Sequence, residues 1–269
     1  MSTKGVYTAL SGAMAQSLKL DTIANNIANV NTPGFKRDQQ VFQEYITERE
    51  KEGTVINVPR IPASPESFYE LNGADKSFVD LAGTYTDFSQ GAPKATGNAL
   101  DVTIEGEGFF EIATPTGVHL TRNGSFRVDG NGQLVTGEGY PVLREAEPGA
   151  DVEARLIRSD SGQVRIEKNG DVLAGDQLLG KLSVSSVADK NALHKVGSQR
   201  YTFKPNFQPE ITPVQNAQLS PGYLESSNVN IVREMTDMIG TTRLFESAQK
   251  AISAYDSMAD KLVNLVPKY

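Results

Sequence analysis

The 269-residue sequence contains no cysteine and no tryptophan. Without cysteine the chain forms no disulfide, thiolate zinc site or cysteine nucleophile, so its stability has to come from packing. A net charge of -7 provides no broad basic surface for phosphate backbones, and we therefore expect no nucleic-acid partner. The hydrophobic fraction of 38% is low for a globular chain, which indicates that part of the chain completes its core against something outside the monomer.

Long apolar runs are also missing. No run approaches the ~18 residues that are needed to span a bilayer. The opening from Met1 to Gly5 leads into a mixed segment without the apolar core of a secretory signal. We expect neither direct membrane insertion nor export through a cleaved Sec signal.

Both ends of the chain have the periodicity of an amphipathic helix, because small or apolar residues recur at alternating steps of four and three. In the first helix these seam positions are Val6, Leu10, Ala13, Ser17, Leu20, Ala24 and Ile27. In the last helix they are Ile231, Met235, Met238, Thr242, Phe245, Ala248, Ile252, Tyr255, Ala259, Leu262 and Val266. A single apolar stripe can be buried only against another helix, in the same chain or in another copy.

A lone pair of such helices buries little relative to the backbone entropy that its ordering costs. We therefore expect the two termini to be mobile in the free monomer and to become ordered when copies stack.

Between the helices, Asn-Gly and Asp-Gly pairs recur among short alternating runs, which predicts β-strands. The expected hairpin turns are Asn123-Gly124, Asp129-Gly130, Asn131-Gly132 and Asn169-Gly170. The candidate strands are residues 100–105, 108–113, 125–128, 164–167 and 180–187. The predicted fold class is α+β, with paired, coiled-coil-like N- and C-terminal helices and a central, mainly antiparallel β domain.

The predicted organisation has four parts. Residues 1–35 form the first helix, and residues 36–98, with Pro59, Pro62 and Pro65, form an extended connector without sustained period. Residues 99–214 form the β domain, and residues 215–269 form the return segment and the last helix. The loop-rich stretch at 145–160 leaves open whether the β region is one domain or two.

Two patterns in the β region could indicate an enzyme. Gly106-Glu107-Gly108 follows a predicted strand, as in a dinucleotide-binding turn, but the chain continues as a strand at Phe109, so we interpret it as a turn. Asp101, Glu105 and Glu107 share one strand face and could pair for glycoside hydrolysis, although a solvated strand face is the favoured interpretation.

The histidines give no stronger signal. His119 and His194 are the only two, and neither has a partner at the spacing of a helical metal site. We expect surface or structural roles for both, and we predict no catalytic residue, no metal, no cofactor and no enzymatic activity.

Asparagine is concentrated where the first helix ends, before Pro33-Gly34. One glycine or asparagine and a proline suffice to end a helix, so the amides exceed what capping requires. We interpret the segment as a joint whose amides satisfy backbone groups between packed neighbours, with a fraying helix end as the alternative. The predicted assembly interface combines seam and joint residues: Leu10, Gly12, Ala13, Leu20, Asn25, Asn26, Asn29, Asn31, Gly34, Phe35, Asn228, Asn230, Met235, Met238, Phe245 and Ile252.

Several motifs occur in the order found in one known family. They are Ala9-Leu10-Ser11-Gly12-Ala13, residues 23–36 (IANNIANVNTPGFK), residues 100–110 (LDVTIEGEGFF), residues 121–126 (TRNGSF) and Ser227-Asn228-Val229-Asn230. Over nearly the whole chain, the sequence resembles the bacterial flagellar axial proteins of the rod and hook.

This resemblance implies a structural subunit of the basal-body rod, the drive shaft that transmits torque. Its inner tube would be the paired terminal helices, its outer domain the β region, and its joint the asparagine-rich segment with the connector. The implied partners are copies of the chain, other rod and hook axial proteins and the flagellar type III export apparatus, and the implied location is the periplasmic rod.

Within the family, Arg243-Leu244-Phe245-Glu246 is more similar to the proximal than to the distal rod subunit. The distal subunit stays the alternative. A periplasmic glycan hydrolase and a secreted adhesin are the competing functions outside the family.

Overall fold

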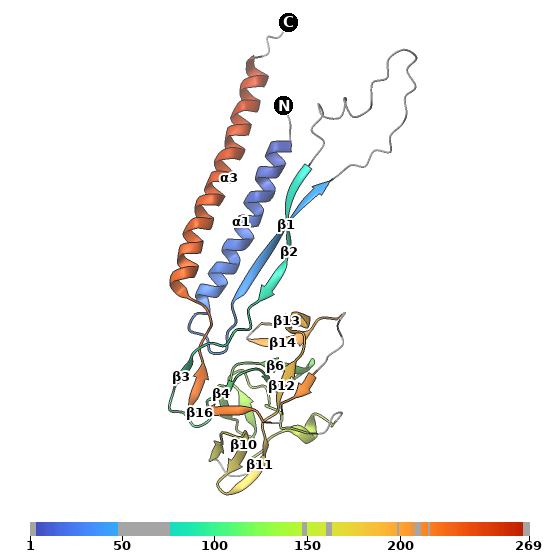
Figure 1. The fold of residues 1–269 in the computed structure, drawn as a ribbon, viewed down its shortest axis with the longest axis vertical. Helices are drawn as coiled ribbons and strands as arrows, with labels where there is room; N and C mark the ends of the chain where they lie inside the picture. The colour runs from blue at the N-terminus through green and yellow to red at the C-terminus, as the bar shows by residue number, and fades with distance from the viewer. Residues whose placement is uncertain are drawn as a thin grey trace, which may run out of the picture. The chain divides into compact units, whose positions relative to one another are not determined.

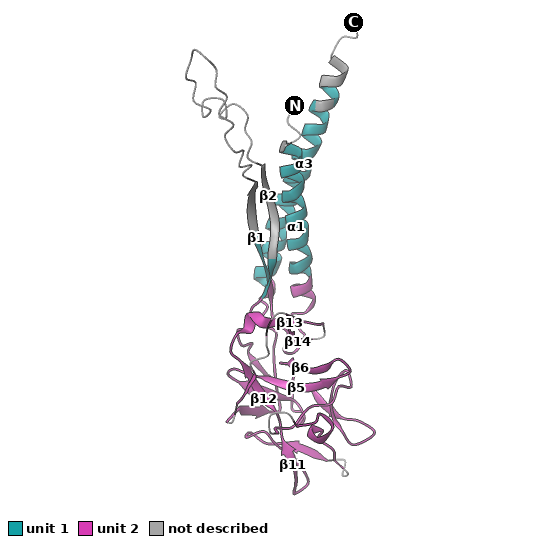
Figure 2. Cartoon of the chain, turned by 90° about the vertical axis from the view of Figure 1, so that its right-hand side faces the viewer, with its two compact units in different colours: residues 1–24, 39–85, 232–269 teal, residues 25–38, 86–231 magenta. Residues whose placement is uncertain are grey.

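The computed structural model describes residues 4–47, 76–146, 150–159, 163–197, 199–205, 207, 211–214 and 216–265. The chain divides into two compact units (Figure 2). Unit 1 comprises Met1–Ala24, Gln39–Tyr85 and Val232–Tyr269, and unit 2 comprises Asn25–Asp38 and Thr86–Ile231. The predicted α+β class is confirmed, because helix α1 (Lys4–Ala28) and helix α3 (Ile231–Leu265) stand before and after a set of β-strands in the sequence (Figure 1).

Unit 1 contains the two helices and a two-stranded ribbon. Neither helix contains proline, and their helical parts in unit 1 lie side by side (Figures 1 and 2). The helices approach closely at Gly5, where a Cβ would lie 2.7 Å from the Tyr255 hydroxyl oxygen. Strands β1 (Asp38–Thr47) and β2 (Lys76–Thr86) form the ribbon. The side chain of Gln40 joins β1 to α1 by donating to the Leu18 carbonyl oxygen at 2.9 Å.

The ribbon lies in the stretch that we expected to be an extended connector without sustained period. Its strands were not predicted, because residues 38–47 and 76–86 lack strict apolar–polar alternation. Pro59, Pro62 and Pro65 lie outside the described residues.

Unit 2 is built from short strands. They are β3 (Pro93–Ala95), β4 (Val102–Glu105), β5 (Phe109–Thr114), β6 (Gly117–Thr121), β7 (Phe126–Val128), β8 (Leu134–Thr136), β9 (Val164–Ile166), β10 (Asp171–Ala174), β11 (Gln177–Lys181), β12 (Val184–Val187), β13 (Leu193–Lys195), β14 (Arg200–Phe203), β15 (Ile211–Pro213), β16 (Gln218–Pro221) and β17 (Tyr223–Glu225). The largest sheet has the order β13-β14-β6-β5-β12-β15, and a smaller one has the order β11-β10-β9. The pairs within both sheets are antiparallel, as predicted.

The turn signals were mostly correct. Residues 129–132 connect the paired strands β7 and β8, and Asn169-Gly170 connects β9 and β10. The hairpin at Asn123-Gly124 was wrong, because β6 pairs with β5 and β14 whereas β7 pairs with β8. Gly124 instead packs against the backbone of Val102, whose N–H donates to the Gly124 carbonyl oxygen at 3.0 Å.

The single strand predicted at 180–187 was also wrong. It is divided into β11 and β12, which belong to different sheets. The division occurs at Leu182 and Ser183, whose N–H groups donate to the carbonyl oxygens of Gly170 and Leu143. The first bond continues the β10–β11 pairing by one residue, since Gly170 directly precedes β10, whereas the second goes to a different segment. The chain therefore changes sheets between Leu182 and Ser183.

Strand β5 contributes to two hydrophobic clusters because successive side chains of a strand point to opposite faces. Phe110 lies in the larger cluster, with its ring 5.1 Å from that of Phe126. Phe109 lies in the smaller cluster, with its ring 5.8 Å from that of Tyr201 and 5.7 Å from that of Phe88. Both phenylalanines are fully buried, so β5 is central to the core of unit 2.

Replacement of Gly124 by alanine should destabilise unit 2, because the added Cβ would lie 1.6 Å from the Val102 carbonyl oxygen. Relief of this clash requires a backbone shift, which we expect to cost about 3 kcal/mol of unfolding free energy. Gly130→Ala is the matched control, since a Cβ there meets nothing within 4 Å. Chemical denaturation of both variants measures the difference, and equal stability of the two would contradict this account of Gly124.

Candidate functional site: the joint and the exposed helix faces

The joint comprises residues 25–38, which include the end of α1, and residues 225–230, which lead into α3; both segments belong to unit 2. Asn26 is 1% exposed and pairs with the backbone of one residue, Asp38. Its Oδ1 accepts from the Asp38 N–H at 3.0 Å, and its Nδ2 donates to the Asp38 carbonyl oxygen at 2.9 Å. An amide side chain is required here because it offers a donor and an acceptor together. Asn26 therefore fastens the end of α1 to the start of β1.

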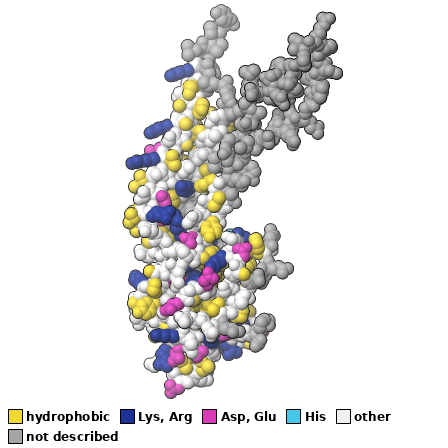
Figure 3. All heavy atoms as spheres, viewed as in Figure 1, with side chains coloured by type: hydrophobic (Ala, Val, Ile, Leu, Met, Phe, Trp, Pro, Cys, Tyr) yellow, Lys and Arg dark blue, Asp and Glu magenta, His cyan; other side chains and the backbone are white. Residues whose placement is uncertain are grey.

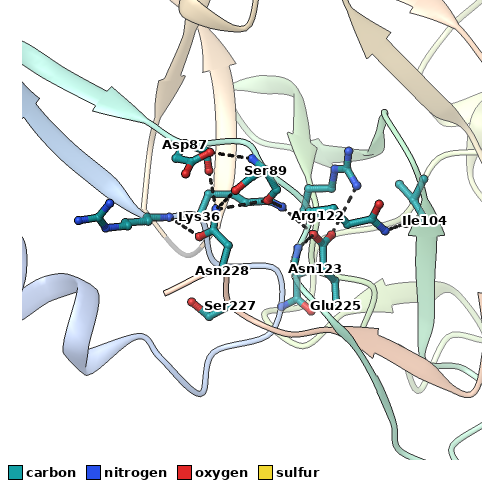
Figure 4. Close-up of polar contacts among 12 residues, drawn as sticks. Lys36, Asp87, Ser89, Ile104, Arg122, Asn123, Glu225, Ser227 and Asn228 are labelled. Atoms are coloured by element: carbon teal, nitrogen blue, oxygen red, sulfur yellow. Dashed lines mark hydrogen bonds and ion pairs between the residues drawn. The ribbon is translucent and has the colours of Figure 1, made fainter. Parts of the chain in front are cut away.

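Asn228 makes the corresponding contacts from the other side of the joint (Figure 4). Its Oδ1 accepts from the Arg37 N–H at 2.8 Å, and its Nδ2 donates to the Asp87 carbonyl oxygen at 2.8 Å and to Ser89 Oγ at 3.0 Å. Asn26 and Asn228 thus satisfy backbone groups of their own chain, whereas the sequence led us to expect groups of packed neighbours.

A buried ion cluster lies beside Asn228 (Figure 4). The Lys36 Nζ is 2.6 Å from Glu225 Oε1, and it also donates to the Ser89 carbonyl oxygen at 2.7 Å. Arg122 Nη1 lies 3.4 Å from Glu225 Oε2, and Arg122 Nη2 donates to the Gly106 carbonyl oxygen at 2.9 Å. We call Lys36, Arg122 and Glu225 the Glu225 cluster.

The cluster holds two cations and one carboxylate with almost no exposure to solvent. Burial lowers the pKa of the Lys36 ammonium, although the charge of Glu225 opposes this shift. Burial also lowers the pKa of the Arg122 guanidinium, again against the charge of Glu225. Since an unpaired buried charge is strongly destabilising, the two cations depend on the carboxylate.

A second ion pair fixes Phe35 and the start of β1. The Lys195 Nζ lies 2.8 Å from Asp38 Oδ2, donates to the Lys36 carbonyl oxygen at 3.0 Å and lies 3.8 Å from the centre of the Phe35 ring. Gly34 has φ +69°, and a Cβ on it would lie 2.7 Å from the backbone of Arg122. Gly34 and Phe35 are therefore buried within the joint of the single chain.

The other predicted interface residues differ in exposure. Ala13 is buried, and Gly12, Leu20, Asn29, Met238, Phe245 and Ile252 are half-buried. Leu10, Asn25, Asn31, Asn230 and Met235 are exposed. Leu10 and Met235 are therefore not covered within the single chain, and their burial against another copy stays a prediction. On α1 the buried face includes Ala13, Ala15 and Ile23, and the predicted seam did not contain the last two.

Each helix presents an exposed apolar stripe in unit 1. The α1 stripe comprises Tyr7, Leu10, Met14 and Leu18, which are 40–61% exposed and follow one another at steps of three or four residues. The α3 stripe comprises Val232, Met235 and Ile239, which are 48–71% exposed at the same spacing. Figure 3 shows hydrophobic side chains at the surface along the helices.

The acidic residues that could have indicated a hydrolase have separate partners. Glu105 accepts a hydrogen bond from Ser220, and Glu107 pairs with Lys190 at 2.7 Å. The hydrogen bond from Lys190 lowers the pKa of Glu107, which suits an ion-pair partner and not a general acid. Asp101 was expected on a solvated face, but it is 6% exposed and accepts from Asn98 Nδ2 at 3.0 Å. The Gly106-Glu107-Gly108 segment is the turn between β4 and β5, as expected.

The two histidines lie in different surroundings. His119 is 4% exposed, and its Nε2 lies 3.0 Å from Thr116 Oγ1. Burial, together with the charge of Arg200, lowers the pKa of His119. His194 is exposed. Among the residues that the structure describes, no group of histidine, aspartate and glutamate could hold a metal ion. No helix in the described part of the chain is both long and apolar enough to cross a membrane.

Three segments match models of flagellar families. Residues 6–36 match the flagella basal body rod protein family, residues 103–174 the D1 domain of the flagellar hook protein FlgE/F/G, and residues 220–265 the C-terminal region of the flagellar basal body rod FlgEFG proteins. The joint and both helices thus fall largely within matched segments.

Curated relatives cover nearly the whole chain. The flagellar basal-body rod protein FlgG of Borreliella burgdorferi is 33% identical over 97% of this chain and 98% of its own length. FlgG of Bacillus subtilis is 32% identical over 97% and 98% of the two chains. The flagellar basal-body rod protein FlgF of Caulobacter vibrioides is 33% identical over 91% and 90%.

Acidification should destabilise unit 2 through His119. Because its pKa is lowered in the folded state, the unfolded chain binds the proton more tightly. The contribution of the neutral ring is complete above the ordinary pKa of 6.5 and is lost as the pH falls from there toward the folded-state value. We expect His119→Gln to lose less melting temperature between pH 7.5 and about 5.5 than the wild type.

Thermal denaturation at the two pH values checks this prediction. His194→Gln is the matched control. Because His194 is exposed, this variant should show the same dependence of melting temperature on pH as the wild type. An equal loss in the wild type and in His119→Gln would contradict the role of His119.

Proposed function

The chain belongs to the FlgF/FlgG family of flagellar basal-body rod proteins, and from this premise we propose that it polymerises through its terminal helices as a torque-transmitting subunit of the proximal (FlgF) type. The observation that carries the mode of assembly is the pair of exposed apolar stripes on α1 and α3. One chain leaves both stripes uncovered although its two helices already lie side by side.

The two stripes can contact each other between copies of the chain, because they lie on two different helices. Contact between the α1 stripe of one copy and the α3 stripe of the next is heterologous, since the two surfaces are not the same patch. A heterologous contact that does not close into a ring adds copies without limit and builds a helical polymer. The same geometry also accepts related axial proteins of the rod and hook.

The strength of one contact is limited. Full burial of a valine, leucine or methionine side chain contributes about 1.5–3 kcal/mol, whereas association costs about 4–15 kcal/mol of translational and rotational freedom. One contact covers both stripes, which comprise seven side chains that are already partly buried in the single chain, so it gains about 5–10 kcal/mol and supports only weak pairing of two copies. A subunit of a polymer contacts several neighbours at once, so the apolar burial of all its contacts together exceeds the cost of association.

The proposal includes delivery as an unfolded chain by the flagellar type III export apparatus and assembly in the periplasm. Membership of the rod family supports this route. It also agrees with terminal helices whose faces are partly uncovered in the single chain and so gain order from neighbours.

The assignment to the proximal type is supported by the residues Arg243-Leu244-Phe245-Glu246 on α3. The relatives do not make this choice, since proteins named FlgG and FlgF match at similar identity. An epitope inserted between Gly175 and Asp176, in the exposed turn between β10 and β11, can be located by gold labelling of purified basal bodies. We expect gold at the membrane-proximal end of the rod, and gold at the far end would assign the chain to the distal type.

Loss of one stripe side chain should weaken polymerisation while the monomer stays folded. We expect Met14→Ser and Met235→Ser each to raise the critical concentration about tenfold or more, because each removes an apolar contact worth about 1.5 kcal/mol or more. Sedimentation of polymer measures the critical concentration, and circular dichroism checks the monomer.

Lys250→Ser is the matched control for this test, since it changes an exposed polar residue on the same helix as Met235. It should leave the critical concentration unchanged. If both methionine variants polymerised at the critical concentration of the wild type, the stripes would not be part of the interface.

A further inference from the structure

We propose that Glu225 is a positioning residue whose carboxylate holds residues 34–38 against residues 225–228. We call these two segments the clasp. The clasp is already closed in the free subunit, before the helices meet their neighbours. The proposal rests on the assembly function above, because the clasp connects the segments that follow α1 and precede α3. On this proposal, the joint folds early and the terminal helices become ordered later.

The two segments of the clasp are held together by backbone and side-chain contacts. The Gly34 N–H donates to the Glu225 carbonyl oxygen at 2.8 Å, and the Arg37 N–H donates to Asn228 Oδ1 at 2.8 Å. The salt bridge from Lys36 joins the same segments across 189 residues of sequence. All of these residues belong to unit 2, so their contacts need no residue of the terminal helices in unit 1.

The Glu225 carboxylate is the centre of this arrangement. It accepts from Lys36 at 2.6 Å and from the Gly91 N–H at 2.8 Å on Oε1, and it pairs with Arg122 on Oε2. Gly91 lies just before β3, and Arg122 lies just after β6. One side chain therefore connects four separate stretches of unit 2.

The charges make the clasp depend on Glu225 more than on either cation. Loss of the carboxylate leaves Lys36 and Arg122 buried together without the one carboxylate that pairs directly with both of them. Loss of Lys36 leaves Arg122 paired with Glu225. Loss of both Lys36 and Glu225 leaves one buried cation, which is the same net charge as in the wild-type cluster.

A closed clasp favours assembly by keeping the ends of the two helical segments close in the unassembled chain. The closure of a long loop costs entropy, and this cost is met when unit 2 folds and not when copies meet. The effective concentration of one helical segment at the other is then high from the folding of unit 2 until the copies assemble.

Unit 2 offers a matched control. Glu111 is also a buried carboxylate with an arginine partner, Arg155, and it accepts from Ser185 in the centre of the large sheet. Glu111→Gln removes a buried charge as Glu225→Gln does, but it lies outside the clasp. The two variants separate a general loss of stability from an opening of the clasp.

Amide hydrogen exchange on the purified full-length monomer tests the proposal. In the wild type we expect protection at residues 34–38 and 225–228, together with strands β5, β6 and β12, and fast exchange at residues 5–22 and 233–258. Glu225→Gln should raise exchange at least tenfold in the clasp while β5 and β12 stay protected. Glu111→Gln should leave exchange in the clasp unchanged.

Lys36→Met with Glu225→Gln provides a rescue that a purely steric role would not give, because the double variant restores the net charge of the cluster. We expect its clasp to exchange more slowly than that of Glu225→Gln. An unprotected clasp in the wild type, an unchanged clasp in Glu225→Gln, or equal opening in Glu111→Gln would each overturn the proposal.

Polymerisation assays separate this proposal from the assembly function. Glu225→Gln should raise the critical concentration at least tenfold although both apolar stripes are intact, and Glu111→Gln should not raise it. A wild-type chain that never polymerises would contradict the proposed function, whereas the exchange result on the monomer would still decide whether the clasp is preformed. An unchanged critical concentration in Glu225→Gln would show that the clasp has no part in assembly.

Discussion

The carboxylate of Glu225 accepts from Lys36 and from the Gly91 backbone and pairs with Arg122, and these three side chains have almost no exposure to solvent. Such a cluster depends above all on its carboxylate, because each charge has lost its hydration and the two cations share one anionic partner. The surrounding contacts depend on the same geometry: Asn228 reaches the Arg37 N–H, and Gly34 reaches the Glu225 carbonyl oxygen. The end of α1 adds to the joint through Asn26 and Asp38. The polar joint therefore has a unique arrangement that apolar packing alone would not impose.

The two units bury their side chains to different degrees. Unit 2 has two hydrophobic clusters of buried residues, and two of its buried carboxylates, Glu111 and Glu225, have basic partners. The helices of unit 1 keep large apolar side chains such as Met14 and Val232 at the surface. A chain that functions alone gains nothing from this exposure, whereas a chain that joins copies needs it. On the proposed mode of assembly, the stability of the subunit comes mainly from unit 2, and the capacity to assemble comes from unit 1.

Periodicity and turn chemistry predicted the α+β class, both helices and the hairpins at 129–132 and 169–170, because these features depend on local sequence. They failed for β1 and β2, whose segments do not alternate strictly, and at Asn123-Gly124, where tertiary contacts decide the pairing. Composition located Asn26, Gly34, Phe35 and Asn228 in the joint, but it did not show that they contact their own chain. Lys36, Arg122 and Glu225 were missed as a cluster, since a buried charge has no period; their presence in or beside the recognised motifs was the available signal. The periodicity did not distinguish the exposed residues Leu10 and Met235 from the buried residue Ala13, because it does not identify what covers a helix face.

A helical reconstruction of the assembled polymer by electron cryomicroscopy is the most direct test of the central claim, that copies join through the terminal helices. The account predicts that Tyr7, Leu10, Met14 and Leu18 of one copy, and Val232, Met235 and Ile239 of another, lose their exposure in contacts between copies. It also predicts that the contacts of Glu225 with Lys36 and Arg122 are the same in the polymer as in the single chain. A polymer held together by unit 2 alone, with the helices on its outer surface and both stripes exposed to solvent, would contradict the account.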